Sequence, residues 1–230
     1  MVIKLNFVVL LIIIVLYISG CNSDDSNPTS SNIPDNPKIM FINASSYRDS
    51  GIVRFIINDD TLNSVKIRYG NYYGYKDIKS GNSLLTIKFY YPDDTVTVIK
   101  NKYFDFEEFC SCVAYDVGSP SSASVTILDD LPVLTYSNTI KVRVANFLTS
   151  EQPINFYMIP DLKIFEKINF TTGTSFMQME PGTFNFSVKY TADTANTILP
   201  IYGQYLSLPR AYSYFIAGSN SKPIYIRTVY

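Results

Sequence analysis

The chain has 230 residues, of which 47% are apolar and 17% charged, a balance typical of a globular protein of one or two domains. Its formal net charge of −1 provides no basic field for nucleic acid. The absence of histidine excludes a Ser-His-Asp triad, a Cys-His dyad and histidine-ligated zinc. The 19 tyrosines and 15 phenylalanines favour strands, because aromatic side chains pack well on a pleated sheet.

An uninterrupted apolar run covers residues 7–18 and ends in Ile18-Ser19-Gly20-Cys21. A membrane-spanning helix needs about 20 apolar residues, so this shorter run fits the core of a signal peptide over residues 1–20. Its end resembles the bacterial lipobox, which the lipoprotein signal peptidase reads. The resemblance implies cleavage between Gly20 and Cys21 and a lipid anchor on the Cys21 thiol. The alternative is an ordinary signal peptide, or a signal anchor, that happens to contain a cysteine.

Residues 21–37 read as a flexible tether, because Ile33 is their only large apolar side chain. Ser23, Asp24 and Asp25 follow the cysteine directly and resemble the acidic export signal of Bacteroidota surface lipoproteins. That resemblance implies a lipid-anchored position on the outer membrane, at the cell surface. A merely soluble acidic linker is the alternative.

The remaining chain predicts two copies of one domain, over residues 38–130 and 140–230, joined by a connector at 131–139. The basis is a weak repeat with a spacing of about 102 residues, longer than the 20–50 residues of solenoid repeats. Four segments match in order: Lys38–Asn43 with Lys141–Asn146, Tyr75–Ile78 with Phe165–Ile168, Tyr103–Phe106 with Tyr205–Leu208, and Phe109–Ala114 with Tyr212–Ala217.

Within each copy, apolar and polar residues alternate with the period of a half-buried strand. Phe184, Phe186 and Val188 fall on one face, whereas Asn185 and Ser187 fall on the other. Short runs of this kind between turn signals predict an all-β fold of two tandem immunoglobulin-like β-sandwich domains.

Three segments carry a family resemblance: Ile39–Ser45, Pro181–Phe184 and Ala211–Gly218. They resemble "domain of unknown function 4397", which occurs in exported bacterial proteins, often in tandem and behind a lipobox. The resemblance covers about residues 38–230. The first copy departs from the family pattern, because Tyr91–Asp94 replaces the Pro-Gly-Thr turn and its core strand holds two cysteines. The family implies an architecture and no established activity.

A tyrosine-rich segment is the first candidate binding site. Tyr69, Tyr72, Tyr73 and Tyr75 lie within seven residues, around two glycines. Sugar rings stack on exposed aromatic rings, so the segment is a possible glycan-binding loop. The alternative is a hairpin whose tyrosines pack inside the sandwich.

Other polar groups have simpler interpretations. Cys110 and Cys112 are expected on one face of a strand as buried small hydrophobes, since no further soft metal ligands accompany them.

Thr61, Thr95 and Thr194 stand in Asp-Thr-x tripeptides that resemble the O-glycosylation pattern of Bacteroidota exported proteins. The adjacent carboxylates are expected to be solvated turn charges or strand gatekeepers, as opposed to the facing pair of a glycoside hydrolase. They are Asp59-Asp60, Asp93-Asp94, Glu107-Glu108 and Asp129-Asp130.

Together these patterns predict a non-enzymatic, lipid-anchored surface protein whose sandwiches act as an interaction or spacer module. We expect no catalytic residue, no metal and no cofactor. The expected partners are the membrane, through the lipid anchor, and a glycan or another surface protein. A glycan-binding lipoprotein is the second hypothesis, and a hydrolase with a carboxylate pair is the third.

Overall fold

The structure is a computed structural model that describes residues 36–47, 51–61, 64–130 and 138–230, and its Asp35–Tyr230 part forms one compact unit. Most of the connector expected at 131–139 lies outside the described residues. Strand β8 ends at Asp130 and β9 begins at Ile140.

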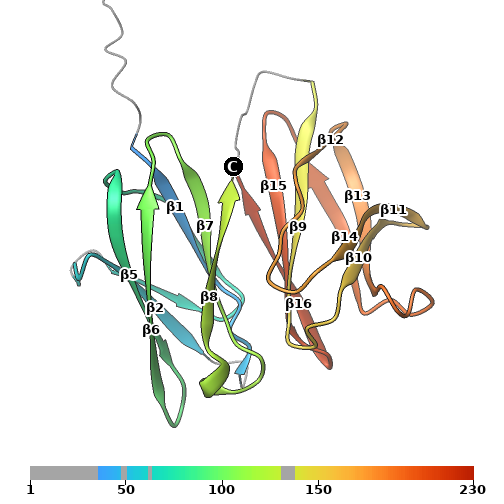
Figure 1. Ribbon diagram of the computed structural model, residues 1–230. Coiled ribbons are helices and arrows are strands. Elements are labelled where there is room, and N and C mark those ends of the chain that lie inside the picture. Colours follow the sequence, from blue (N-terminus) through green and yellow to red (C-terminus); the bar gives the residue numbers. More distant parts are fainter. Residues whose placement is uncertain (1–35, 48–50, 62–63, 131–137) are drawn as a thin grey trace, which may run out of the picture. The chain divides into compact units, whose positions relative to one another are not determined.

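The first sandwich contains two four-stranded sheets, ordered β4-β1-β7-β8 and β3-β2-β5-β6 (Figure 1). Neighbouring strands are antiparallel except β1 and β7, which run parallel. The strands are β1 Lys38–Asn43, β2 Ile52–Ile57, β3 Val65–Arg68, β4 Tyr72–Asp77, β5 Gly81–Tyr90, β6 Thr95–Phe104, β7 Phe109–Tyr115 and β8 Ser124–Asp130. A short 3-10 turn, Pro120–Ser122, precedes β8.

The second sandwich repeats this topology, because its sheets are ordered β12-β9-β15-β16 and β11-β10-β13-β14. Adding eight to each strand number of the first sandwich gives the second, including the parallel pair, β9 with β15. The strands are β9 Ile140–Leu148, β10 Ile154–Met158, β11 Leu162–Ile168, β12 Met177–Met179, β13 Gly182–Tyr190, β14 Leu199–Leu206, β15 Ala211–Ser219 and β16 Lys222–Val229. The predicted all-β fold of two tandem immunoglobulin-like sandwiches is confirmed.

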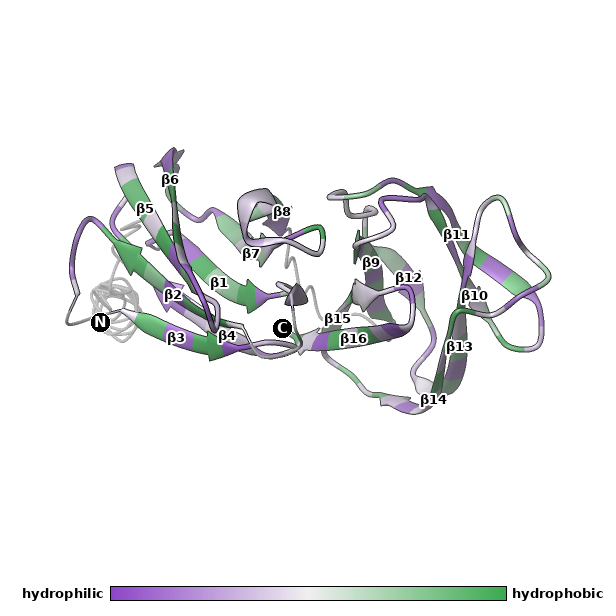
Figure 2. Ribbon diagram, turned by 90° about the horizontal axis from the view of Figure 1, so that it is seen from below, coloured by the Kyte–Doolittle hydropathy of each residue, from purple (hydrophilic) through white to green (hydrophobic). Residues whose placement is uncertain are grey.

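Each sandwich buries its own core between its two sheets. Bands of hydrophobic and hydrophilic residues alternate along the strands, so that one face of each sheet turns inward (Figure 2). Phe41, Phe55 and Phe89 are fully buried in the first core, and Phe156, Phe186 and Tyr214 are fully buried in the second.

Asn43 and Asn146 show the repeat at atomic detail. Both are fully buried at equivalent places in β1 and β9. In each case the side-chain amide donates to two backbone carbonyls, and its oxygen accepts from the backbone N–H two residues on. The carbonyls belong to Gly51 and Ile67 for Asn43, at 3.0 and 2.9 Å, and to Gln152 and Ile168 for Asn146, at 2.9 and 3.1 Å.

Two of the four sequence matches need correction. The pairing of Tyr75–Ile78 with Phe165–Ile168 is wrong, since Tyr75 lies in β4 and Phe165 lies in β11, whose counterpart is β3. The match of β7 with β15 is out by one residue. When the sandwiches are aligned on their shared asparagine, Cys110 and Cys112 correspond to Tyr212 and Tyr214.

Candidate functional site

The two sandwiches contact each other through a third apolar cluster. The cluster is formed by the outer faces of two sheets, the one that contains β1 and the one that contains β9. The middle strands of these sheets are therefore buried on both faces. Phe147 and Phe215 stack in a tilted arrangement, with ring centroids 6.4 Å apart, and Tyr115 of the first sandwich lies 5.5 Å from Phe147. The fully or largely buried members are Met40, Ile42, Ala44, Val113, Ala145, Phe147, Phe215, Ala217 and Ile226.

Arg143 joins the sandwiches at one side of this cluster. It projects from β9, is only 2% exposed, and donates through all three of its guanidinium nitrogens. Nε donates to the Ser213 hydroxyl at 2.7 Å, and one terminal nitrogen donates to the Asp129 carbonyl at 2.9 Å. The other terminal nitrogen donates to the Asp130 carboxylate of β8 and to the Tyr230 hydroxyl at 3.0 Å.

Asp130 is also 2% exposed, and the rest of its carboxylate is occupied by its own sandwich. Its second oxygen accepts from the Tyr75 hydroxyl at 2.6 Å and from the Ser111 hydroxyl at 2.7 Å. Such a buried ion pair needs these extra hydrogen bonds, because removing two charges from water is costly. The hydrogen-bonding groups of Arg143 and Asp130 are thus satisfied by partners within the protein.

The electrostatics fix the protonation states of this cluster. Burial raises the pKa of the Tyr75 hydroxyl far above its usual value, and the facing Asp130 carboxylate raises it further. Burial lowers the pKa of the Arg143 guanidinium, but Tyr230 and Asp130 outweigh that effect and raise it overall. The tyrosine therefore stays neutral and the arginine stays charged.

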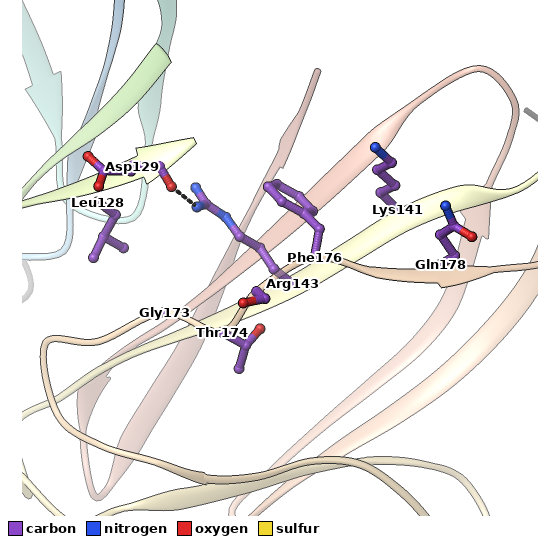
Figure 3. A pocket seen from close by; sticks show the side chains of 9 residues that line it. Leu128, Asp129, Lys141, Arg143, Gly173, Thr174, Phe176 and Gln178 are labelled. Carbon is purple, nitrogen blue, oxygen red and sulfur yellow. Dashed lines mark hydrogen bonds between the residues drawn. The ribbon is translucent and has the colours of Figure 1, made fainter. Parts of the chain in front are cut away.

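A pocket of about 650 Å³ opens beside Arg143, between β8 and the edge of the second sandwich (Figure 3). Lys141, Arg143, Phe176 and Gln178 line it from β9 and the β12 segment, and Leu128 and Asp129 line it from β8. Phe176 packs against the Arg143 guanidinium, 4.8 Å from ring centroid to Cζ. The volume is that of a small-molecule site, and the walls combine polar groups with one aromatic ring.

The residues predicted to carry the anchor lie outside the described residues. These are Gly20 and Cys21 at the cleavage and lipidation site, and Ser23, Asp24 and Asp25 of the export signal. No helix among the described residues is long and apolar enough to span a membrane.

The tyrosine-rich segment does not form one platform. Tyr75 is held inside the contact between the sandwiches, and the Tyr69 hydroxyl is buried close to Gly218 of the second sandwich, so neither is available to a glycan. Tyr72 and Tyr73 are exposed at 40% and 49%. They are consecutive residues of β4, so their side chains point to opposite faces of the sheet.

The predicted O-glycosylation residues Thr61, Thr95 and Thr194 are all exposed. Thr95 is the first residue of β6, and the other two lie outside the strands. This places all three within reach of an enzyme, and their modification stays a prediction.

The cysteine prediction is confirmed, because Cys110 and Cys112 are free thiols buried in the first core. The carboxylate expectation is wrong for Asp130, which is buried in the ion pair although its neighbour Asp129 is exposed. Adjacent strand residues point to opposite faces, which explains the difference. Among the described residues, no group of His, Cys, Asp or Glu side chains could hold a metal ion.

Sequence reasoning missed two buried charged residues, Arg143 and Asp116. Asp116 is fully buried and accepts from the hydroxyls of Ser45 and Tyr91 and from the backbone N–H of Tyr47. Its position after the apolar β7 gave no signal. Arg143 did give one, since it is a charge within the otherwise mostly apolar strand β9.

Comparison with known proteins adds little. No family model and no curated protein matches the chain, so its resemblance to "domain of unknown function 4397" stays a prediction. One solved structure that it resembles is a "putative cell adhesion protein" from Bacteroides fragilis, at 9% identity and a TM-score of 0.20. The match covers 85% of this chain and 97% of that one. So slight a likeness assigns neither fold nor function, and the fold rests on the strand pairing described above.

Proposed function

We propose that this chain is a non-enzymatic, lipid-anchored surface protein whose two sandwiches act together as one interaction or spacer module. The observation that carries the proposal is the contact between the sandwiches, where Arg143 and Asp130 are bound within an apolar interface. A fixed contact of this kind suits a module that presents its exposed surfaces in a constant arrangement.

The chemistry of the buried charges supports a structural role. The Asp130 carboxylate accepts from Arg143, Tyr75 and Ser111, and Asp116 is similarly surrounded by donors. A general acid or base must exchange a proton with a substrate, whereas these carboxylates are committed to partners inside the fold.

The anchor is supported by the sequence alone, through the lipobox-type segment that ends at Cys21 and the tether that follows it. Each buried methylene of an acyl chain contributes about 0.8 kcal/mol, and two or more chains hold a protein stably on a membrane. The export signal Ser23-Asp24-Asp25 supports display at the outer surface of the outer membrane.

The experiment is expression of the full chain in a Bacteroidota host with and without globomycin, which inhibits the lipoprotein signal peptidase. We expect uncut precursor to accumulate with the drug, and a Cys21→Ser variant to remain uncut without it. External protease should degrade the mature protein on intact cells. Processing that ignores both the drug and the substitution would refute the anchor, and full protection from protease would refute surface display.

Glycan binding is the second candidate function, and the exposure of Tyr72 and Tyr73 on the edge strand β4 favours it. A glycan array probed with the wild type and with a Tyr72→Ala/Tyr73→Ala variant tests this location. Loss of binding in the variant supports it, and equal binding by both proteins rules it out.

A further inference from the structure

Strand β14 is irregular at one place, and the irregularity rearranges its side chains. Phe184 of β13 pairs with Gln204, but Phe186, two residues on, pairs with Ile201, so β14 carries one extra residue. Gly203 adopts a left-handed conformation there, with φ of 63°. This is a β-bulge, a feature that re-aims side chains at sheet edges and beside functional sites.

The bulge places two tyrosines on the same side of the sheet. Residues three apart on a regular strand point to opposite faces, but here Ile201 and Gln204 both point inward, exposed by 1% and 7%. Tyr202 and Tyr205 consequently both turn outward, and each is 66% exposed. They share the edge of the sheet that contains β13 (Figure 1).

The backbone beneath these rings is held rigidly by Gln204. Its Nε2 donates to the Tyr202 carbonyl at 2.9 Å and to the Tyr225 hydroxyl of β16 at 3.3 Å. Its Oε1 accepts from the Arg227 guanidinium at 3.1 Å and from the Tyr214 hydroxyl at 3.4 Å. Gln204 thereby ties β14 to the opposite sheet, so little conformational freedom is left to lose on binding.

The surface between the rings is open and polar. A side chain at Gly203 would meet nothing within 4 Å, and the Gly203 N–H donates to the Asn185 side-chain oxygen at 2.8 Å. Thr183 is exposed opposite Tyr205. The two tyrosine rings lie on either side of Gly203, which has no side chain, and the Asn185 amide and the Thr183 hydroxyl lie beside it. This combination matches the apolar faces and hydroxyl edges of pyranose rings.

We propose that Tyr202 and Tyr205 form a binding platform for a neutral oligosaccharide, whose rings stack on the tyrosines while Asn185 and Thr183 contact its hydroxyls. This inference deepens the proposed interaction module, on which it rests, by naming a partner class and a site. It differs in place from Tyr72 and Tyr73, which lie on the other sandwich.

An added protein strand fits this edge poorly. Pairing along β14 requires a continuous row of free N–H and C=O groups, but Pro200 has no N–H and the bulge at Gly203 breaks the row. A partner of β14 would therefore contact its exposed side chains and not its backbone.

The first sandwich supplies a matched control. Tyr103 of β6 is the counterpart of Tyr205 and is 59% exposed. The pairing of β5 with β6 is continuous, without a bulge, and Tyr103 is the one tyrosine of β6.

The test is an array of neutral hexose oligosaccharides probed with the detergent-solubilised full chain, followed by calorimetry with the best binder. We expect Tyr202→Ala/Tyr205→Ala to weaken binding by about tenfold or more, since each ring contributes a stacking contact. Tyr202→Trp/Tyr205→Trp should retain binding, and Tyr103→Ala should leave it unchanged. Both tyrosines are exposed, so an unchanged unfolding temperature verifies that the variants are folded.

Four outcomes would overturn the inference: no oligosaccharide bound by the wild type, equal binding by the alanine variant, a loss of binding that follows Tyr103 or Tyr72/Tyr73 instead, or binding only of extended peptides included on the array. Because the assay uses solubilised protein, a failure here leaves anchoring and surface display untouched, and these are tested separately by globomycin and external protease.

Discussion

Arg143 shows what a single residue can and cannot reveal from sequence. Val142 and Val144 of β9 point into the second core, and Arg143, which lies between them, points away from it. The outward face is buried as well, because the first sandwich covers it. Periodicity assigns the face of a strand, but only the tertiary contact decides whether that face is exposed.

At Arg143 we predict a large and asymmetric effect of substitution. Arg143→Met leaves the Asp130 charge buried without its cation and should destabilise the fold by about 3–5 kcal/mol. The double variant Arg143→Met/Asp130→Leu should be more stable than Arg143→Met, because no unpaired charge remains. Denaturant unfolding measures both. Lys163→Met, at an exposed ion pair, is the control and should not move the midpoint. A double variant less stable than Arg143→Met would contradict this account.

The two core thiols make stability depend on alkaline pH. Burial raises the pKa of Cys112 to about 12 and raises that of Cys110 as well. In the unfolded chain both thiols ionise at about pH 8.5. Unfolding therefore releases protons above that pH, so stability should fall as pH rises from about 9 toward about 12.

A Cys110→Ala/Cys112→Ala variant isolates this contribution, although it will be less stable overall. Its stability should decline less steeply than that of the wild type over the same pH range. Ellman's reagent at pH 8 should label both thiols only after unfolding. Fast labelling of the native protein would show that the thiols are exposed.

At the scale of strands, the sequence repeat indicates duplication but not register. The match of β1 with β9 succeeds because Asn43 and Asn146 perform the same hydrogen bonding. The match of β7 with β15 slips by one residue, because the alternation is uninformative where both faces are apolar. The bulge at Gly203 also escapes prediction, since it depends on how β14 pairs with β13.

The shared asparagines should have equal importance in the two sandwiches. Asn43→Ala and Asn146→Ala each remove two buried hydrogen bonds to backbone carbonyls, and each should cost about 1–3 kcal/mol. Asn101→Ala, at an exposed position of β6, should have almost no effect on the unfolding midpoint. If Asn43→Ala or Asn146→Ala shifted the unfolding midpoint no more than Asn101→Ala does, the side-chain hydrogen bonds of that asparagine would not stabilise the sandwich.

At the scale of the molecule, composition and alternation suffice to predict two sandwiches, and nothing in either predicts how they meet. The contact joins residues far apart in sequence, such as Tyr75 with Tyr230, whose ring centroids are 5.5 Å apart. Its apolar members are the same residue types that fill the cores. The exposed tyrosines on β14 likewise become visible only once the sheet edge is known.

The shared interface should make the two sandwiches unfold as one unit. Phe215 is fully buried at this contact, so Phe215→Asp places a charge there and should separate thermal unfolding into two transitions. Ile99→Asp, at a position 62% exposed, should keep the single transition of the wild type. Calorimetry distinguishes them, and two transitions in the wild type would mean that the interface does not couple the domains.

The central claim is that acyl chains on Cys21 hold this two-sandwich module at a membrane. Mass spectrometry of the mature protein purified from its native host tests it most directly. The account predicts an N-terminal peptide that begins at Cys21 and carries the mass of a diacylglyceryl group on sulfur. A peptide that retains residues before Cys21, with an unmodified thiol, would contradict it.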